Sequence, residues 1–309
     1  MRILVFGAGV LGCNLANDFF RAGKDVTLLA RGEWGKRLKS DGLRIKSKFS
    51  PFTKVSRIPI ITSLSPDDLY DVIFISARYT QIPEITGILS QNRSENLVFV
   101  GNNVSTKKLV DSLPGKNVMF AFSSSAGHRE ADRVCSVDLR KITIGEPSGG
   151  NKNEAFIKKL FESTKLKVTY EPYMEDYLLC HAAFVLPAAF ACYRTDGDLR
   201  KIKSDKEYID SIIDANIEGY RAIEKLGHKI LPEADKNYLS DAYRNTCRKF
   251  FRLICATSLG KICVSDHAMN AVGEMSALNR DIKSILFTSP DEYPVWQKLE
   301  KDSENYLQK

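Results

Sequence analysis

Long apolar runs are scarce in this chain of 309 residues. No run of apolar residues reaches the 18 or more that a membrane helix requires. The apolar N-terminus turns to glycine after six residues, which is too early for a signal peptide. The sequence therefore predicts a cytoplasmic protein that does not bind a membrane.

Patterned cysteines and paired histidines are also lacking. The seven cysteines are scattered and include no C-x-x-C pair, which is typical of reduced thiols in a chain of this length. The four histidines include no two at metal-ligand spacing on a helix. We therefore expect neither a disulfide framework nor a metal site.

The composition is otherwise that of a globular protein. Hydrophobic residues make up 43% and charged residues 27% of the chain. A single core rarely grows past roughly 250–300 residues, so the length predicts two domains. The charge is uneven, because residues 1–170 carry 26 Lys and Arg against 16 Asp and Glu, whereas residues 171–309 carry 19 against 22. Such a basic half suits either a nucleic acid or a polyanionic cofactor.

Strands and helices alternate through the first 170 residues. Short apolar runs predict buried strands, and helical spacing of apolar residues predicts the helices between them. The expected strands are 2–6, 25–30, 71–77, 96–101, 117–122, 140–145 and 166–170, and the expected helices are 10–22, 80–90, 105–112 and 151–163. This alternation predicts a doubly wound, mostly parallel sheet of the Rossmann type over residues 1–170.

Helical periodicity dominates the rest of the chain. Residues 174–194, 206–227, 235–258, 264–286 and 292–308 are the expected helices. Residues 171–309 are therefore predicted to form an all-α second domain that contributes to substrate binding or dimerisation.

The segment from Gly7 to Gly12 reads G-x-G-x-x-G, with Ala8, Val10 and Leu11 between the glycines. It follows a predicted strand and opens a predicted helix, which is the context of a dinucleotide-binding turn. Gly7 permits the tight turn, Gly9 lets backbone N–H groups approach a pyrophosphate, and Gly12 lets helix and strand pack closely. The helix start adds a partial positive charge for the phosphates.

The end of the second strand distinguishes between the two nicotinamide cofactors. An acidic residue there binds the ribose 2′-hydroxyl of NAD, but this chain has Arg31, which suits the 2′-phosphate of NADP(H). Lys36 follows within reach of the same corner. The remaining basic residues up to Arg57 are expected to be solvated surface charges.

Two further residues follow strand ends. Arg78 lies just past strand 71–77, and Asn102 just past strand 96–101. Ligands of doubly wound sheets bind at the carboxyl ends of the strands, so both residues are candidates to line the nicotinamide half of a site shared with helix 174–194. An ordinary loop arginine and a turn asparagine are the alternatives.

These motifs together resemble one enzyme family. GAGVLG, LLARG, DVIFISARYTQ and VFVGNN, followed by a helical domain, resemble ketopantoate reductase (2-dehydropantoate 2-reductase). The resemblance implies NADPH-dependent reduction of ketopantoate to pantoate, a step of pantothenate synthesis. Family members usually carry Lys where Arg78 stands, and Gln-Asn-Gly where Gly101, Asn102 and Asn103 stand.

The second domain departs from that family. The resemblance implies a general-acid lysine on its first helix, yet no lysine occurs between Lys167 and Lys201. His181, one turn after Tyr177, is the candidate that replaces it, because imidazole can protonate an alkoxide near neutral pH. A core histidine is the alternative. His267 and Lys261 are further candidate donors.

Three functions follow from these observations. The first is an NADPH-dependent reductase of a 2-keto acid, acting on a small carbonyl substrate. The second is an opine- or hydroxyacid-type dehydrogenase, since the missing lysine would fit a changed substrate. The third is a non-catalytic NADP(H)-binding protein. Nucleic-acid binding is not expected, because no recognition motif accompanies the basic surplus. A homodimer is left open.

Overall fold

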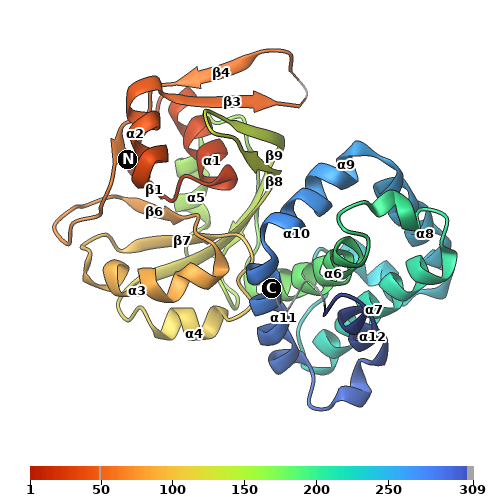
Figure 1. Cartoon of the computed structure of the whole chain (residues 1–309). Coiled ribbons are helices and arrows are strands. Elements are labelled where there is room, and N and C mark those ends of the chain that lie inside the picture. The colour runs from red at the N-terminus through yellow and green to blue at the C-terminus, as the bar shows by residue number, and fades with distance from the viewer. Residues whose placement is uncertain (49, 305–309) are drawn as a thin grey trace. The chain divides into compact units, whose positions relative to one another are not determined.

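The computed structural model describes residues 1–48 and 50–304, and of residues 259 and 263 the backbone alone. The chain divides into two compact units, Met1–Met174 and Glu175–Lys309 (Figure 1). Each unit is described by itself below.

The first unit is a sheet with helices on its faces. Its strands are β1 Arg2–Phe6, β2 Asp25–Leu29, β3 Leu43–Ser47, β4 Thr53–Ser56, β5 Ile60–Ile61, β6 Val72–Ile75, β7 Asn96–Val100, β8 Asn117–Arg129, β9 Val134–Gly145 and β10 Lys167–Tyr170. Its helices are α1 Val10–Arg21, α2 Gly32–Asp41, α3 Ile82–Gln91, α4 Thr106–Asp111 and α5 Glu154–Phe161. The predicted fold class is confirmed.

The strands follow the order β4-β3-β9-β8-β7-β6-β1-β2-β5, with β10 paired to β9. The stretch from β8 to β5 is parallel, and the order reverses at β1, which pairs with β2 on one side and β6 on the other. That reversal is the switch point at which doubly wound sheets bind ligands. The antiparallel pairs β8–β9 and β3–β4 were not expected.

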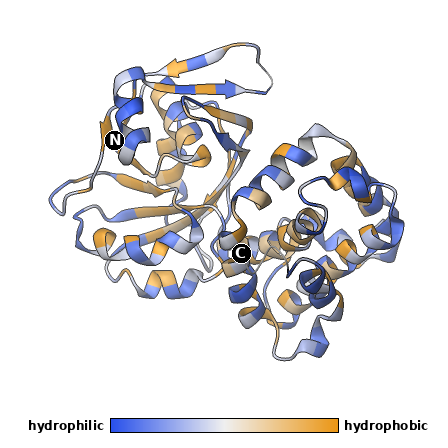
Figure 2. Ribbon diagram, in the orientation of Figure 1, coloured by the Kyte–Doolittle hydropathy of each residue, from blue (hydrophilic) through white to orange (hydrophobic). Residues whose placement is uncertain are grey.

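The core of this unit forms where α1 and α5 cover the sheet. Phe19 of α1 lies 5.3 Å from Phe74 of β6 and 5.2 Å from Phe161 of α5, measured between ring centroids. All three rings are buried. Apolar residues concentrate along the strands, and the outer faces of the helices are more polar (Figure 2). This packing holds the C-terminal part of α1 against β6 and α5.

The second unit is helical. Its helices are α6 Met174–Arg194, α7 Lys206–Lys225, α8 Arg244–Ala256, α9 Ser258–Gly260, α10 Asp266–Asn270, α11 Val272–Leu286 and α12 Pro294–Asp302. Two expected helices are wrong in extent. Glu233–Leu239 and Asp241–Tyr243 are 3-10 turns ahead of α8, and a π-helical turn at Lys261–Ser265 and a break at Ala271 divide the segment 264–286.

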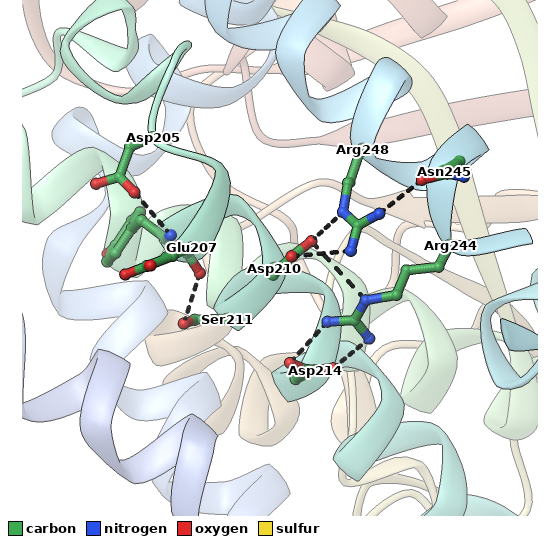
Figure 3. Close-up of polar contacts among 9 residues, drawn as sticks. Asp205, Glu207, Asp210, Ser211, Asp214, Arg244, Asn245 and Arg248 are labelled. Atoms are coloured by element: carbon green, nitrogen blue, oxygen red, sulfur yellow. Dashed lines mark hydrogen bonds and ion pairs between the residues drawn. The ribbon is translucent and has the colours of Figure 1, made fainter.

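Four charged residues hold α7 against α8 (Figure 3). Arg244 makes two hydrogen bonds to Asp214, of 2.6 and 2.9 Å, and Arg248 makes two to Asp210, of 2.5 and 2.9 Å. The Arg248 guanidinium lowers the pKa of Asp210. Paired two-point contacts of this kind fix the angle as well as the distance between helices.

Helix α6 contains no unbroken run of 18 apolar residues, as expected from the sequence. Among the described residues it is nevertheless long and apolar enough, by length and mean hydropathy, to cross a membrane. Its apolar stretch is 72% buried inside the protein, and the core helix of a soluble protein passes the same test. The feature is therefore weak evidence for a membrane span.

Candidate functional site

The glycine turn after β1 has the geometry that its sequence predicts. Gly7 has φ +112°, and a Cβ there would lie 2.4 Å from the carbonyl oxygen of Ser76. A Cβ on Gly12 would lie 2.0 Å from the carbonyl oxygen of Gly7. Side chains are thus excluded at both positions, and the close approach of α1 to β1 depends on the two glycines.

Gly9 differs from its neighbours because the space beside it is open. A Cβ at Gly9 would meet no atom within 4 Å. Gly9 is also the N-cap of α1, with no side-chain cap and no acidic residue in the first turn. The first N–H groups of α1, including those of Val10 and Leu11, therefore have no carboxylate beside them as an acceptor. They are available to bind an anion at the helix start.

Trp34 and Arg129 complete this corner, and sequence reasoning missed both. Trp34 of α2 donates from Nε1 to the carbonyl oxygen of Ala8 at 3.0 Å. The Arg129 guanidinium carbon, at the end of β8, lies 5.2 Å from the centroid of the Trp34 ring. Burial raises the pKa of the Cys13 thiol to about 12, and the charge of Arg129 opposes that rise. Arg129 therefore adds positive charge beside α1.

The two basic residues expected after β2 behave differently. Arg31 is exposed and is the N-cap residue of α2, two residues after the end of β2. Lys36 instead pairs with Glu33 at 2.6 Å, and the Lys36 side chain is 75% exposed. Arg31 therefore stays the candidate for a 2′-phosphate, whereas the charge of Lys36 is shared with a carboxylate.

Arg78 and Asn102 follow β6 and β7 at the same edge of the sheet, because these strands run parallel to β1. Arg78 is exposed, and Asn102 is half-buried. The residue before Asn102 is close to the glycine turn, since a Cβ on Gly101 would lie 3.9 Å from Leu11 Cδ1. The structure thus brings these predicted residues and Gly7–Gly12 to one edge.

Two amide oxygens at this edge lack partners. Asn102 Oδ1 and Asn103 Oδ1 are buried and accept no hydrogen bond within the described part of the chain. Buried polar atoms are nearly always paired, so such an atom points to a ligand or water. Together with the open space at Gly9 and the uncapped start of α1, they fit a dinucleotide with its nicotinamide end near β7.

His181 and His267 lie near one another in the helical unit. Burial and, to a smaller extent, the charge of His267 together lower the pKa of His181 to about 3. At neutral pH its ring is therefore neutral and lacks the second ring proton that an imidazolium gives as an acid, so this setting does not favour the donor role predicted for His181.

The other candidates in this unit have different settings. His267 is exposed on α10, and Lys261 is exposed at the start of the π-helical turn. Glu218 of α7 accepts hydrogen bonds from the backbone N–H groups of Val295 and Trp296 at 2.9 and 2.8 Å. Glu218 therefore caps α12.

A Rossmann sheet with a glycine turn at its switch point, joined to a helical unit, defines a class of nicotinamide-dependent oxidoreductases. Within that class, residues 3–149 match the family model described as ketopantoate reductase PanE/ApbA. The resemblance read from the motifs is thereby confirmed, and the expected nicotinamide cofactor agrees with it. No curated protein sequence matches the chain.

Solved structures share the fold over the whole length. A 2-dehydropantoate 2-reductase from Geobacter metallireducens has 13% identity and a TM-score of 0.77, with 99% of each chain covered. One from Methylococcus capsulatus has 14% identity and a TM-score of 0.74, covering 100% of this chain and 98% of the other. A D-mandelate dehydrogenase with NADH and anilino(oxo)acetate has 12% identity and a TM-score of 0.74, covering 99% of each. At these identities the likeness concerns the fold.

Proposed function

We propose that the protein is an NADPH-dependent reductase of a 2-keto acid, with the reduction of 2-dehydropantoate to pantoate as the first reaction to test. Arg31 carries this proposal, because it stands after β2 where an acid would bind the 2′-hydroxyl of NAD. The family match of residues 3–149 supports the same chemistry.

Bound NADPH supplies the hydride in such a reaction. The start of α1 and the open space at Gly9 would hold the pyrophosphate, and Arg31 would pair with the 2′-phosphate. The unpaired Oδ1 of Asn102 would accept a hydrogen bond from the nicotinamide amide or from a water.

Of the two histidines, His267 is the better candidate to donate the proton to the alkoxide, because the pKa of about 3 leaves His181 neutral and not an imidazolium acid near neutral pH. Neutral His181 then acts as a hydrogen-bonding neighbour.

An opine- or hydroxyacid-type dehydrogenase is the second candidate. The absence of lysine between Lys167 and Lys201 favours it, since the acid that the resemblance implies on α6 is missing. The fold shared with a D-mandelate dehydrogenase is consistent with it. A non-catalytic NADP(H)-binding protein is the third. In each case we expect a cytoplasmic protein. Its ligand would be a small carbonyl compound, and it would bind neither nucleic acid nor a membrane. Whether it forms a homodimer is left open.

A screen of NADPH oxidation separates these functions. The purified protein is mixed with NADPH and, one at a time, 2-dehydropantoate, other 2-keto acids and β-keto compounds. Turnover of 2-dehydropantoate or another 2-keto acid supports the first function, and turnover confined to β-keto compounds supports the second. Tight NADPH binding without oxidation of the cofactor by any compound overturns the reductase proposal.

A further inference from the structure

Three metal-binding side chains meet at the end of the hairpin formed by β8 and β9. His128, Glu130 and Cys135 each offer one donor atom, and these atoms lie within 4.8 Å of one another. His128 Nε2 lies 3.6 Å from Glu130 Oε1, and Cys135 Sγ donates to the same oxygen at 3.2 Å. We call these residues the hairpin cluster.

The hairpin itself places the cluster. His128 of β8 is directly opposite Cys135 of β9 in the antiparallel register, so both side chains share a face. Glu130 is two residues after His128 and returns to that face. The Glu130 N–H donates to the carbonyl oxygen of Arg133 at 2.9 Å, which closes the turn. The arrangement therefore rests on backbone pairing.

A neighbouring arginine orients the carboxylate. Arg133 Nε donates to Glu130 Oε2 at 2.7 Å, and this bond is the main cause that lowers the pKa of Glu130. The charge of Arg133 is also balanced by Asp132 at 3.6 Å. Glu130 is thus ionised, and its Oε1 is held toward His128 and Cys135. In metal sites, hydrogen bonds from neighbouring residues orient the ligands in the same way.

Imidazole, thiolate and carboxylate together are a ligand set that zinc prefers, whereas magnesium and calcium prefer oxygen alone. Zinc bonds of about 2.0–2.3 Å place tetrahedral ligand atoms roughly 3.3–3.8 Å apart. Two of the distances between donor atoms in the hairpin cluster, 3.6 Å from His128 Nε2 to Glu130 Oε1 and 3.2 Å from Cys135 Sγ to the same oxygen, are close to that spacing. His128 and Glu130 are 43% and 39% exposed, so an ion can enter from solvent.

We propose that the hairpin cluster is a Zn²⁺ site with His128, Glu130 and Cys135 as protein ligands and water at the remaining position. On binding, the Cys135 sulfur gives its proton to solvent and its electron pair to the metal. The site does not depend on the proposed reductase activity. Because Arg129 stands between two of the ligands, metal binding also restrains the strand end that carries Arg129 toward Trp34.

Cobalt is a suitable probe, because Co²⁺ takes zinc sites and a cobalt–thiolate bond gives a charge-transfer band in the near ultraviolet. The full chain without an affinity tag is titrated with Co²⁺, and the bound Co²⁺ is then displaced with Zn²⁺. We expect one Co²⁺ to bind per chain and to give the charge-transfer band. The band should disappear when one equivalent of Zn²⁺ is added.

Variants then assign the ligands. Cys135→Ser should abolish the band, and His128→Ala and Glu130→Gln should each weaken Co²⁺ binding about tenfold or more. His267→Ala removes an exposed imidazole elsewhere and should bind as the unmodified chain does. Far-ultraviolet circular dichroism checks the fold of each variant. A band that persists in Cys135→Ser, or no band in the unmodified chain, would overturn the proposal.

Discussion

Asn216 of α7 donates from Nδ2 to the carbonyl oxygen of Ala183 at 2.9 Å. Ala183 is four residues before Pro187, which lies inside α6 and has no N–H to offer that carbonyl. Asn216 is fully buried and also donates to the carbonyl of Phe184 at 3.1 Å. A side chain of one helix thus replaces the hydrogen bond that proline removes from another.

This relationship predicts a coupling between two substitutions. Asn216→Ala should lower the free energy of unfolding by about 1–3 kcal/mol, since the Ala183 carbonyl is left buried without a donor. In a Pro187→Ala background, residue 187 has a backbone N–H that can donate to the Ala183 carbonyl. Asn216→Ala should then lower the free energy of unfolding by about 1 kcal/mol less than it does in the unmodified chain. Urea denaturation of the four proteins measures the difference. An equal cost in both backgrounds would show that Asn216 acts by packing alone.

Substitution of Gly9 and of Gly12 in the glycine turn should have opposite effects on NADPH binding and on stability. Gly9→Ala should leave the melting temperature nearly unchanged, because its Cβ enters open space, yet weaken NADPH binding at least about tenfold where the pyrophosphate would lie. Gly12→Ala should destabilise the fold by about 1–3 kcal/mol, because its Cβ meets the Gly7 carbonyl. Thermal melts and fluorescence titrations measure both, and each variant is the control for the other. If Gly9→Ala binds NADPH as tightly as the unmodified chain does, the pyrophosphate does not lie beside Gly9.

Local signals explain how much of the fold could be predicted. The first strand–helix–strand unit was predicted within one residue at each end, because its apolar runs, its glycine turn and Gly23 are contiguous in the sequence. Helix 174–194 was found with the predicted bounds. The helix expected over 235–258 failed because its first part forms 3-10 turns. Helix α2 and strands β3 and β4 were missed because charged residues obscure their periodicity.

The candidate site shows the same division. Gly7–Gly12 and Arg31 could be found because the motif and the strand end are adjacent in sequence. Trp34 and Arg129 could not, because their contact depends on folding the hairpin back toward α2. The hairpin cluster was missed for a similar reason, since cross-strand pairing brings His128 to Cys135.

Arg31→Ala should remove the preference for NADPH over NADH. A charged hydrogen bond to phosphate contributes roughly 1.5–3 kcal/mol, so NADPH affinity should fall about ten- to a hundredfold while NADH affinity stays nearly constant. Lys36→Ala is the matched control and should have a small effect, because Lys36 pairs with Glu33 at the surface. Equal losses for both cofactors in calorimetric titrations would make Arg31 a structural residue.

The two histidines of the helical unit should contribute unequally to turnover. If the protein reduces a keto acid, His267→Gln should lower kcat about 10²–10⁴-fold through loss of the acid, with NADPH affinity unchanged. His181→Gln should lower kcat less, because the residue is neutral at neutral pH. Steady-state kinetics on both variants decides, and a larger loss for His181→Gln would return the donor role to His181.

The lowered pKa of His181 also predicts how stability changes with acid. In the folded chain His181 titrates at about 3, whereas an unfolded histidine titrates near 6.5, so between these values the unfolded state binds the additional proton. The stability contribution of neutral His181 is therefore complete above about pH 6.5 and declines as the pH falls toward 3. His181→Gln removes this contribution, so the variant should lose less stability than the unmodified chain between pH 7 and pH 4.5. Urea denaturation of both proteins at pH 7 and pH 4.5 measures this loss of stability. The carboxylates are common to both proteins, so their contribution cancels in the difference.

His267→Gln should reduce the decline in part, because the neighbouring charge is one of the two causes of the lowered pKa. Identical declines in the unmodified chain and in His181→Gln would show that His181 is solvated and titrates as an ordinary histidine.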